Sequence, residues 1–152
     1  MSSSYQMVVE HDRLGRLLGI EVVEVRPGYA KTKLLTKEEH LNGVGVVHGG
    51  VLTTLADIAF ALAVNAYGEI TLAIHLDISF LKAVRRGVLF AEAQEISRRT
   101  RIVTCDVKIQ DESGELVALF HGVAYRTGHP LPQSEARLKE TPSSSPGENP
   151  SS

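Results

Sequence analysis

Polar and apolar residues alternate with a period of two along much of this chain, which is typical of β-strands with one buried face. Residues 102–109 show the pattern most plainly, because Val103, Cys105 and Val107 alternate with polar side chains. Strands are also predicted at residues 20–25, 29–35, 72–80, 88–96 and 116–125. The turn Arg26-Pro27-Gly28 predicts a hairpin of the first two strands, and short turns between the last four predict an antiparallel meander.

Helical spacing is found near the N-terminus, where the apolar positions of residues 8–18 and a stop at Gly19 predict a short helix. Both ends of the chain carry few apolar residues, and ordering such segments costs entropy without burial in return. The 152 residues are enough for a single core. We therefore predict a loose N-terminus at residues 1–7, one domain at 8–130 and a disordered tail at 131–152.

A longer helix is predicted at residues 51–66, which are apolar on most faces. Its polar residues Thr53, Asp57 and Asn65 are separated by multiples of four, so they fall with Ala61 on one side of the helix. One long buried helix packed against a curved antiparallel sheet is an α+β arrangement.

Composition and charge exclude several classes of function. A formal net charge of −2 gives no general attraction to nucleic acid. Cys105 is the only cysteine, which excludes an internal disulfide and fits a reducing cytosol. No signal peptide or membrane-spanning run is present, so we expect a cytoplasmic location and no membrane partner. His48, His75 and His121 match no metal-ligand spacing, so no metal is expected.

Residues 42–50, NGVGVVHGG, place four glycines directly before the long helix. Glycines let a ligand approach the backbone, and the free N–H groups of a first helical turn stabilise negative charge. An oxyanion hole is built in this way, although a flexible loop at the start of a helix is the simpler interpretation.

Asp57 is unusual because a carboxylate inside so apolar a helix loses both helix propensity and hydration. A structural interpretation must give it a partner, either backbone donors or an arginine. Alternatively, a carboxyl whose pKa is raised by about one or two units from its reference of about 3.9 remains ionised at neutral pH and can act as base or nucleophile. No Gly-x-Ser-x-Gly motif is present, and Cys105 lies on the apolar face of a strand, so covalent Ser or Cys hydrolysis is unsupported.

Basic residues gather at two turns. They are Lys82, Arg85 and Arg86 at one turn, and Arg98, Arg99 and Arg101 at the other. Such residues are either solvated turn residues or the groups that hold the phosphates of a ligand.

Residues 42–63, NGVGVVHGGVLTTLADIAFALA, resemble the signature of the phenylacetate-degradation (PaaI-type) hotdog thioesterases. The resemblance extends to residues 77–81 and 117–120, and so covers nearly the whole predicted domain. It implies the hotdog fold, in which an antiparallel sheet wraps a long helix. It also implies homodimers joined edge to edge through their sheets, often doubled into tetramers.

The same resemblance implies an acyl-CoA thioesterase acting on an aryl or medium-chain acyl group, with coenzyme A as part of the substrate and no cofactor. Gly49 N–H becomes the donor to the thioester carbonyl, with Gly50 allowing close packing behind it. Asp57 becomes the base or nucleophile, Asn42 orients water and His48 supports the oxyanion side. Gly49 and Asp57 of one site come from different protomers.

One departure from the family pattern concerns a helper hydroxyl. Ala61 and Ala73 stand where some relatives have Ser or Thr, and His75 or Thr71 is a candidate substitute. Thr53 lies on the helix side that faces the substrate in such dimers.

Two other functions compete with this interpretation. A hotdog hydratase normally has a His a few residues after its Asp, and residues 58–62 contain none. A non-catalytic acyl-CoA-binding module is the alternative outside the enzymes.

Overall fold

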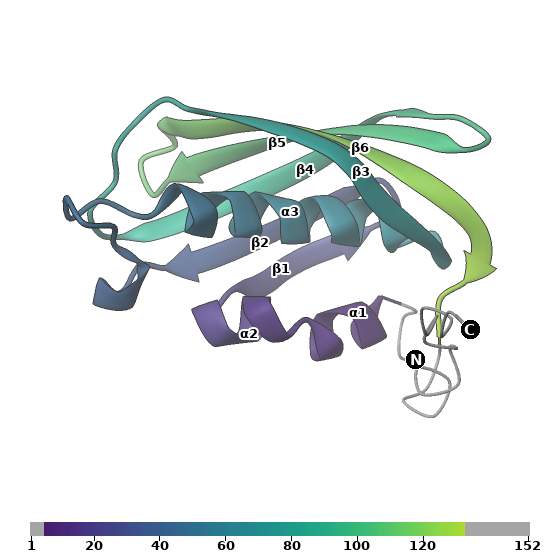
Figure 1. Ribbon diagram of the computed structural model, residues 1–152, viewed down its shortest axis with the longest axis horizontal. Coiled ribbons are helices and arrows are strands. Elements are labelled where there is room, and N and C mark those ends of the chain that lie inside the picture. Colours follow the sequence, from purple (N-terminus) through teal and green to yellow (C-terminus); the bar gives the residue numbers. More distant parts are fainter. Residues whose placement is uncertain (1–4, 133–152) are drawn as a thin grey trace, which may run out of the picture.

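The computed structural model describes residues 5–132, and the predictions for residues 1–4 and 133–152 lie outside them. A six-stranded antiparallel sheet curves around one long helix (Figure 1). The α+β hotdog prediction is therefore confirmed. Leu131, which was predicted to begin the tail, is buried and its N–H donates to the Gly68 carbonyl at 2.9 Å.

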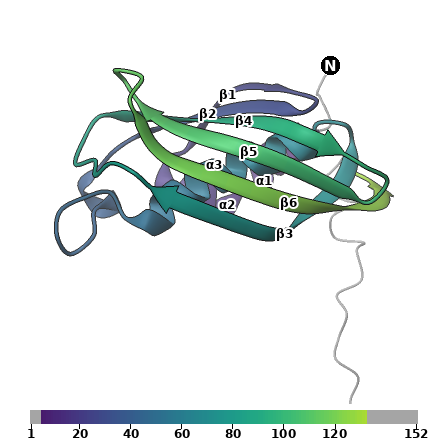
Figure 2. The ribbon, with the colours of Figure 1, turned by 90° about the horizontal axis from the view of Figure 1, so that it is seen from above.

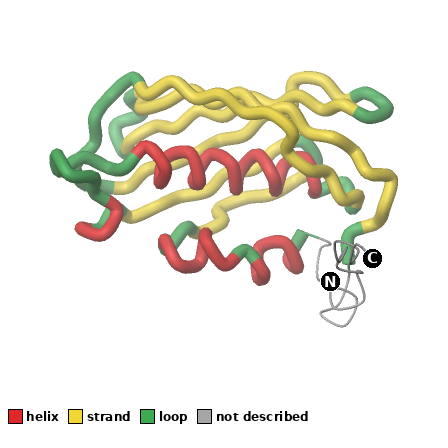
Figure 3. Tube along the Cα trace, in the orientation of Figure 1, coloured by secondary structure: helices red, strands yellow, loops and turns green. Residues whose placement is uncertain are grey.

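Figure 3 distinguishes the helices, in red, from the strands, in yellow. The helices are α1 (Gln6–His11), α2 (Arg13–Leu18), the 3-10 helix η1 (Glu38–His40) and α3 (Gly49–Asn65). The strands are β1 (Glu21–Arg26), β2 (Tyr29–Leu35), β3 (Glu69–Phe80), β4 (Val88–Arg98), β5 (Ile102–Asp111) and β6 (Leu116–Pro130).

The predicted N-terminal helix is divided in two at Asp12, whose backbone is extended. The Asp12 carboxylate caps α2 by accepting a hydrogen bond from Gly15 N–H at 2.8 Å, as an N-cap residue does. Gly19 ends α2 in the left-handed conformation, with φ of 79°, as predicted. α1 begins at Gln6, inside the stretch predicted to be loose. In Figure 1 both helices lie below α3.

The core forms where α3 packs on the concave face of the sheet. Leu55, Ala59 and Ala63 of α3 are fully buried, and the alternate residues Val103 and Cys105 of β5 are fully buried opposite them. The strand alternation predicted for residues 102–109 is thus confirmed. Small side chains on α3 allow the helix to lie close to the strands.

The predicted meander is only partly right. The sheet order is β1-β2-β4-β5-β6-β3, so β4, β5 and β6 form a meander but β3 pairs with β6 at the far edge (Figure 2). The segment after β3 is held by Leu81 N–H and Lys82 N–H, which both donate to the Val117 carbonyl. Val47 N–H donates to the Val84 carbonyl at 2.7 Å, so this connection lies beside the loop before α3. A short turn in the sequence does not distinguish a hairpin from such a crossing.

Asn65 ties the last turn of α3 to the start of β3. Its Nδ2 donates to the carbonyls of Ala61 at 2.8 Å and Thr71 at 2.9 Å, and its Oδ1 accepts from Thr71 N–H at 2.8 Å. Asn65 and Thr71 are both buried, so water cannot replace these bonds.

We expect Asn65→Ala to lower the free energy of unfolding by about 2–4 kcal/mol, because it leaves buried N–H and C=O groups unsatisfied. Urea denaturation measures the change. Thr54 is the control, since its hydroxyl donates to the Gly50 carbonyl at the exposed start of the helix. Thr54→Ala should change stability by less than about 0.5 kcal/mol, and an equal loss in both variants would contradict the prediction.

Candidate active site

Asn42 organises the glycine-containing loop before α3. Its Oδ1 accepts hydrogen bonds from Val44 N–H at 3.1 Å and Val46 N–H at 3.2 Å, and its own N–H donates to the Val46 carbonyl at 2.7 Å. Gly45 completes the turn with φ of 80°, a conformation that favours glycine. The side-chain oxygen of Asn42 is therefore engaged within the loop, whereas its amide NH₂ has no hydrogen-bond partner among residues 5–132.

His48 caps the start of α3 and leaves one backbone donor free. Its Nδ1 accepts from Gly50 N–H at 2.8 Å, and its carbonyl accepts from Val51 N–H at 2.9 Å and Leu52 N–H at 3.2 Å. Gly49 N–H donates to no residue in the part of the chain that the structure describes. The single unused N–H of this first turn is thus the one predicted to contact the carbonyl.

Gly49 packs closely against a side chain of β3. A Cβ on Gly49 would lie 3.0 Å from Cζ of Phe80, whereas a Cβ on Gly50 would lie 3.0 Å from the Nδ1 of His48. Both glycines therefore have close neighbours, but only the neighbour of Gly49 lies on a different element, strand β3. Phe80 was not among the predicted site residues, although its strand belongs to the resemblance.

Asp57 is half-buried on the open side of α3. Its carboxylate forms no hydrogen bond or ion pair with any residue from 5 to 132, so the partner that a structural role requires is missing there. Burial raises the pKa of Asp57, and the negative charge of Asp12 raises it further. A raised pKa makes the carboxylate a stronger base.

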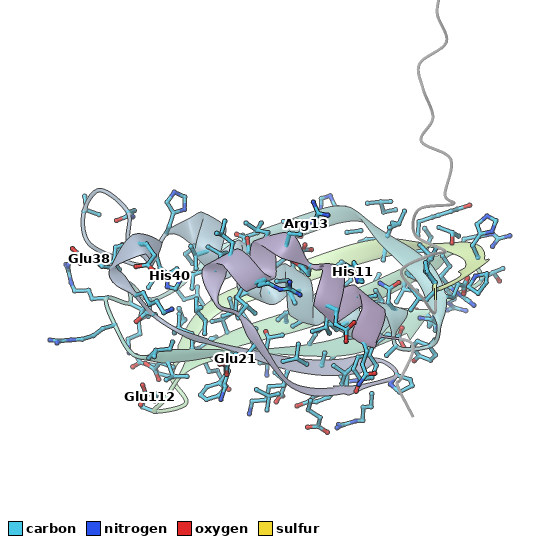
Figure 4. The ribbon with its side chains drawn as sticks, turned by 90° about the horizontal axis from the view of Figure 1, so that it is seen from below. His11, Arg13, Glu21, Glu38, His40 and Glu112 are labelled. Carbon is cyan, nitrogen blue, oxygen red and sulfur yellow. The ribbon has the colours of Figure 1, made fainter. Side chains whose placement is uncertain are left out.

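His40 links α2 to the loop before α3 (Figure 4), and sequence reasoning missed it. It is buried, its Nδ1 accepts from Lys37 N–H at 2.9 Å, and its Nε2 lies 2.8 Å from the Leu18 carbonyl. A donor on one side and an acceptor on the other require a neutral ring with its proton on Nε2. His48 N–H donates to the His40 carbonyl at 2.8 Å, so this residue positions the start of α3.

The side of α3 that was predicted to carry the polar residues contains some side chains bonded within the fold and others that are only half-buried. Thr53 donates its hydroxyl to the Gly49 carbonyl at 2.7 Å, which uses that proton within the helix. Ala61 is half-buried one turn after Asp57. Together with Asp57, Thr53 and Ala61 form the open stripe of α3.

The candidate residues on β3 do not converge on Asp57. Ala73 and His75 are exposed, and the His75 Nε2 lies 3.6 Å from the Asp77 Oδ2 on the outside of the sheet. Thr71 is buried and bonded to Asn65. Neither proposed substitute for a helper hydroxyl is brought to Asp57 within one chain.

Two of the predicted phosphate-binding residues have other partners. Lys82 Nζ lies 2.7 Å from the Asp111 Oδ2 and 2.6 Å from the Glu115 Oε2. Arg98 pairs with Glu95 at 2.9 Å and its guanidinium stacks 3.7 Å from the ring centroid of Tyr67. Both side chains therefore hold turns of the fold.

The remaining basic residues are at opposite ends of β4. The Arg85 side chain donates a hydrogen bond to the Gly45 carbonyl at 3.3 Å and so stabilises the glycine-containing loop before α3. Arg86 at this end and Arg99 and Arg101 at the other are exposed and have no side-chain partner among residues 5–132. The 11 residues of β4 separate the two ends by roughly 33 Å. The phosphates of one ligand cannot touch both ends of a single chain.

Other kinds of site find no support in the described residues. No group of three His, Cys, Asp or Glu side chains within residues 5–132 is arranged to hold a metal ion. Burial raises the pKa of the Cys105 thiol to about 12, so this cysteine is an unreactive core residue, as expected. No helix in the same range is long and apolar enough to cross a membrane.

Comparison with known families and proteins gives a consistent result. Residues 44–118 match the family model of the thioesterase superfamily. A protein of Archaeoglobus fulgidus named as an esterase is 39% identical over 124 residues, covering 81% of this chain and 80% of the relative. The acyl-coenzyme A thioesterase PaaI of Escherichia coli is 34% identical over 120 residues, covering 78% and 86%.

Solved structures of such proteins superpose on most of the chain. The E. coli PaaI protein from the phenylacetic acid degradation operon has a TM-score of 0.81 at 30% identity, covering 86% of this chain and 97% of that protein. A thioesterase of Streptococcus pneumoniae solved with coenzyme A has a TM-score of 0.70 at 26% identity, covering 73% and 88%.

The raised pKa of Asp57 predicts a pH-dependent change in stability. Between pH 3.8 and the raised pKa of the folded protein, the folded carboxyl holds its proton more tightly than the unfolded one, so the free energy of unfolding falls as pH rises. Asp57→Asn removes this loss. We expect the variant to be more stable than wild type at neutral pH by about 0.5–1 kcal/mol, a difference kept small by solvent contact. Urea denaturation over a pH series should show this difference vanishing below pH 3.8; a difference that grows as pH falls would contradict it.

Proposed function

The chain belongs to the thioesterase superfamily, as a PaaI-type member with the hotdog fold, and from this premise we propose that it hydrolyses an aryl or medium-chain acyl-CoA to the free acid and coenzyme A. One observation carries the proposal. Among residues 5–132, the Gly49 N–H in the first turn of α3 has no acceptor, and the half-buried carboxylate of Asp57 in the same helix has no partner. These are the two groups that thioester hydrolysis requires, an oxyanion donor and a base or nucleophile.

In the proposed reaction Gly49 N–H donates to the thioester carbonyl oxygen as negative charge develops there. Asp57 either takes a proton from the attacking water or attacks the carbonyl carbon itself, forming an anhydride that water then opens. In both routes the C–S bond breaks, coenzyme A leaves as a thiolate that takes up a proton, and the acyl group ends as the acid. Asn42 orients the water through its amide, and His48 holds Gly50 so that the Gly49 donor keeps its direction.

The distance along α3 supports a site shared between two chains. Gly49 and Asp57 are eight residues apart in one helix, which corresponds to about 12 Å of helix axis. Hydrogen-bond reach is about 3 Å, so one carbonyl group is not contacted by both residues of a single helix. We infer that Gly49 of one protomer and Asp57 of its partner form each site.

β3 supplies the surface through which two chains would pair. It is an edge strand, and its residues Leu72, Ile74, Leu76 and Phe80 are exposed at 57%, 58%, 39% and 52%. Unpaired edges that carry large apolar side chains are templates for pairing with another strand. We propose an isologous homodimer with β3 antiparallel to the β3 of the partner. A dimer of such dimers follows the family pattern.

Antiparallel pairing also places opposite ends of the two sheets together. The Gly49 end of one chain, with Arg86, then lies at the same end of the dimer as Arg99 and Arg101 of the partner. These exposed guanidinium groups are the proposed phosphate-binding residues for coenzyme A. Lys82 and Arg98 are left out because carboxylates already hold them.

Thiol release from a panel of acyl-CoA esters tests the reaction. We expect Asp57→Asn to lower kcat by 10²–10⁴-fold, the usual contribution of a positioned base. Gly49→Pro removes the backbone donor, and proline is tolerated at the first position of a helix. The ψ of 135° at His48 suits a following proline. Loss of this donor should cost about 10²–10³-fold in kcat.

Gly49→Ala is the matched control, because it adds the same Cβ beside Phe80 but keeps the N–H. We expect it to lose much less activity than Gly49→Pro. Full activity in Asp57→Asn, or equal losses in the two Gly49 variants, would contradict the assigned roles. Wild type that binds acyl-CoA but releases no thiol above background would favour the non-catalytic binding module.

Mixing two inactive variants tests the shared site. In a mixed dimer of Asp57→Asn and Gly49→Pro, one site has both defects and the other is intact. Random exchange in a 1:1 mixture makes half of the dimers mixed, so activity should recover to about a quarter of wild type. Mixing after unfolding and refolding together ensures exchange, and separate refolding of each variant is the control. No recovery would show that each site lies within one chain.

A further inference from the structure

A cavity of about 230 Å³ lies between the N-terminal helices and the open side of α3. Val8 and Val9 of α1 form one part of its wall, and Ile58, Ala61 and Leu62 of α3 form another. Figure 4 shows the two short helices in front of α3 when the molecule is seen from below. The lining is mainly apolar, which suits a hydrocarbon group.

Asp57 does not itself line the cavity, but its neighbours on α3 do. Ile58 follows Asp57 directly, and Ala61 lies one turn further along the same open stripe of α3. Asp12, which also lines the cavity, is the residue whose charge acts on Asp57. A group held at the Asp57 carboxylate therefore has this cavity beside it.

We propose that this cavity receives the acyl group of the thioester and that α1 and α2 form the outer wall that limits its length. The inference rests on the proposed hydrolysis and adds the place of the acyl group and the residues that select it. Val9 on the outer wall and Ala61 on the inner wall are the proposed selecting residues.

The volume indicates the size of the acyl group. An apolar cavity of about 150 Å³ in another protein is known to bind benzene. At about 230 Å³, this cavity has room for one ring with a short linker, or for an aliphatic chain of similar bulk. Benzoyl, phenylacetyl and hexanoyl groups are of this size, and a long fatty acyl chain exceeds it.

The α2 part of the outer wall is held by contacts between its backbone and the side chains of Ile58 and His40. A Cβ on Gly15 of α2 would lie 2.6 Å from Cδ1 of Ile58, so α2 approaches α3 as closely as glycine allows. The end of α2 is held by His40, whose Nε2–H donates to the Leu18 carbonyl. With α2 held in place, the side chains on the outer wall, including Val9 of α1, determine the space. A larger residue at position 61 would fill part of the cavity, so the small side chain of Ala61 leaves space for the acyl group.

Val9 variants test the wall. With Val9→Phe we expect kcat/KM for hexanoyl-CoA to fall at least tenfold, because one methylene of misfit in such pockets is worth 10–200-fold, while acetyl-CoA stays within about twofold. Val9→Ala should raise the ratio of octanoyl-CoA to hexanoyl-CoA hydrolysis. Leu17→Phe is the matched control, since Leu17 is 81% exposed on α2 and does not line the cavity.

Each outcome bears on one claim. Equal losses on acetyl-CoA and hexanoyl-CoA in Val9→Phe, or the same selectivity change in Leu17→Phe, would overturn the acyl cavity and leave hydrolysis intact. Circular dichroism checks folding, and if Val9→Phe does not fold, an unchanged chain-length ratio in Val9→Ala overturns the inference. If wild type releases no thiol from any ester, the proposed function fails. Calorimetric binding of hexanoyl-CoA and acetyl-CoA to the same variants then tests separately whether the cavity binds the acyl group.

Discussion

The enclosure of α3 by the curved sheet is the constraint on which the rest of the structure depends. Residues such as Leu55 and Ala59 are fully buried, whereas Thr53, Asp57 and Ala61 remain half-buried. A helix packed on most sides keeps only one open stripe, so any polar group that it offers to a ligand must lie there. A carboxylate on the buried sides would carry a large desolvation cost. Asp57 therefore lies on the side of α3 where a carboxylate costs the least desolvation.

Side chains bonded to backbone groups fix both ends of α3. The His48 side chain accepts a hydrogen bond from Gly50 N–H at the start of α3, and Asn65 joins the end of α3 to β3. His40 connects the start of α3 to α2, so the helix and the N-terminal wall of the cavity share one support. A donor and a carboxylate placed on such a rigid element keep their geometry without help from mobile loops.

Local structure was predictable where periodicity alone determines it. The alternation of β5 and the apolar stripe of α3 were confirmed, as was the stop at Gly19. The pairing of β3 with β6 was missed because it joins segments that are distant in the chain. The break at Asp12 was missed because the helical spacing of the apolar residues continues across it, although the Asp12 carboxylate caps a new helix there. Gly49 was indicated by its motif, and the structure adds that its N–H has no acceptor in the described part of the chain. Lys82 was assigned to phosphate, since nothing in the local sequence shows that Asp111 lies beside it.

The exposed edge of β3 has a consequence for how activity scales with the amount of protein. If each site is completed across that edge, as we propose, turnover per chain depends on the fraction of chains that are paired, which follows mass action. Dilution would then silence the protein without any inhibitor. A newly synthesised chain would likewise be unable to consume CoA esters until it met a second copy, so the expression level itself would set a threshold for hydrolysis.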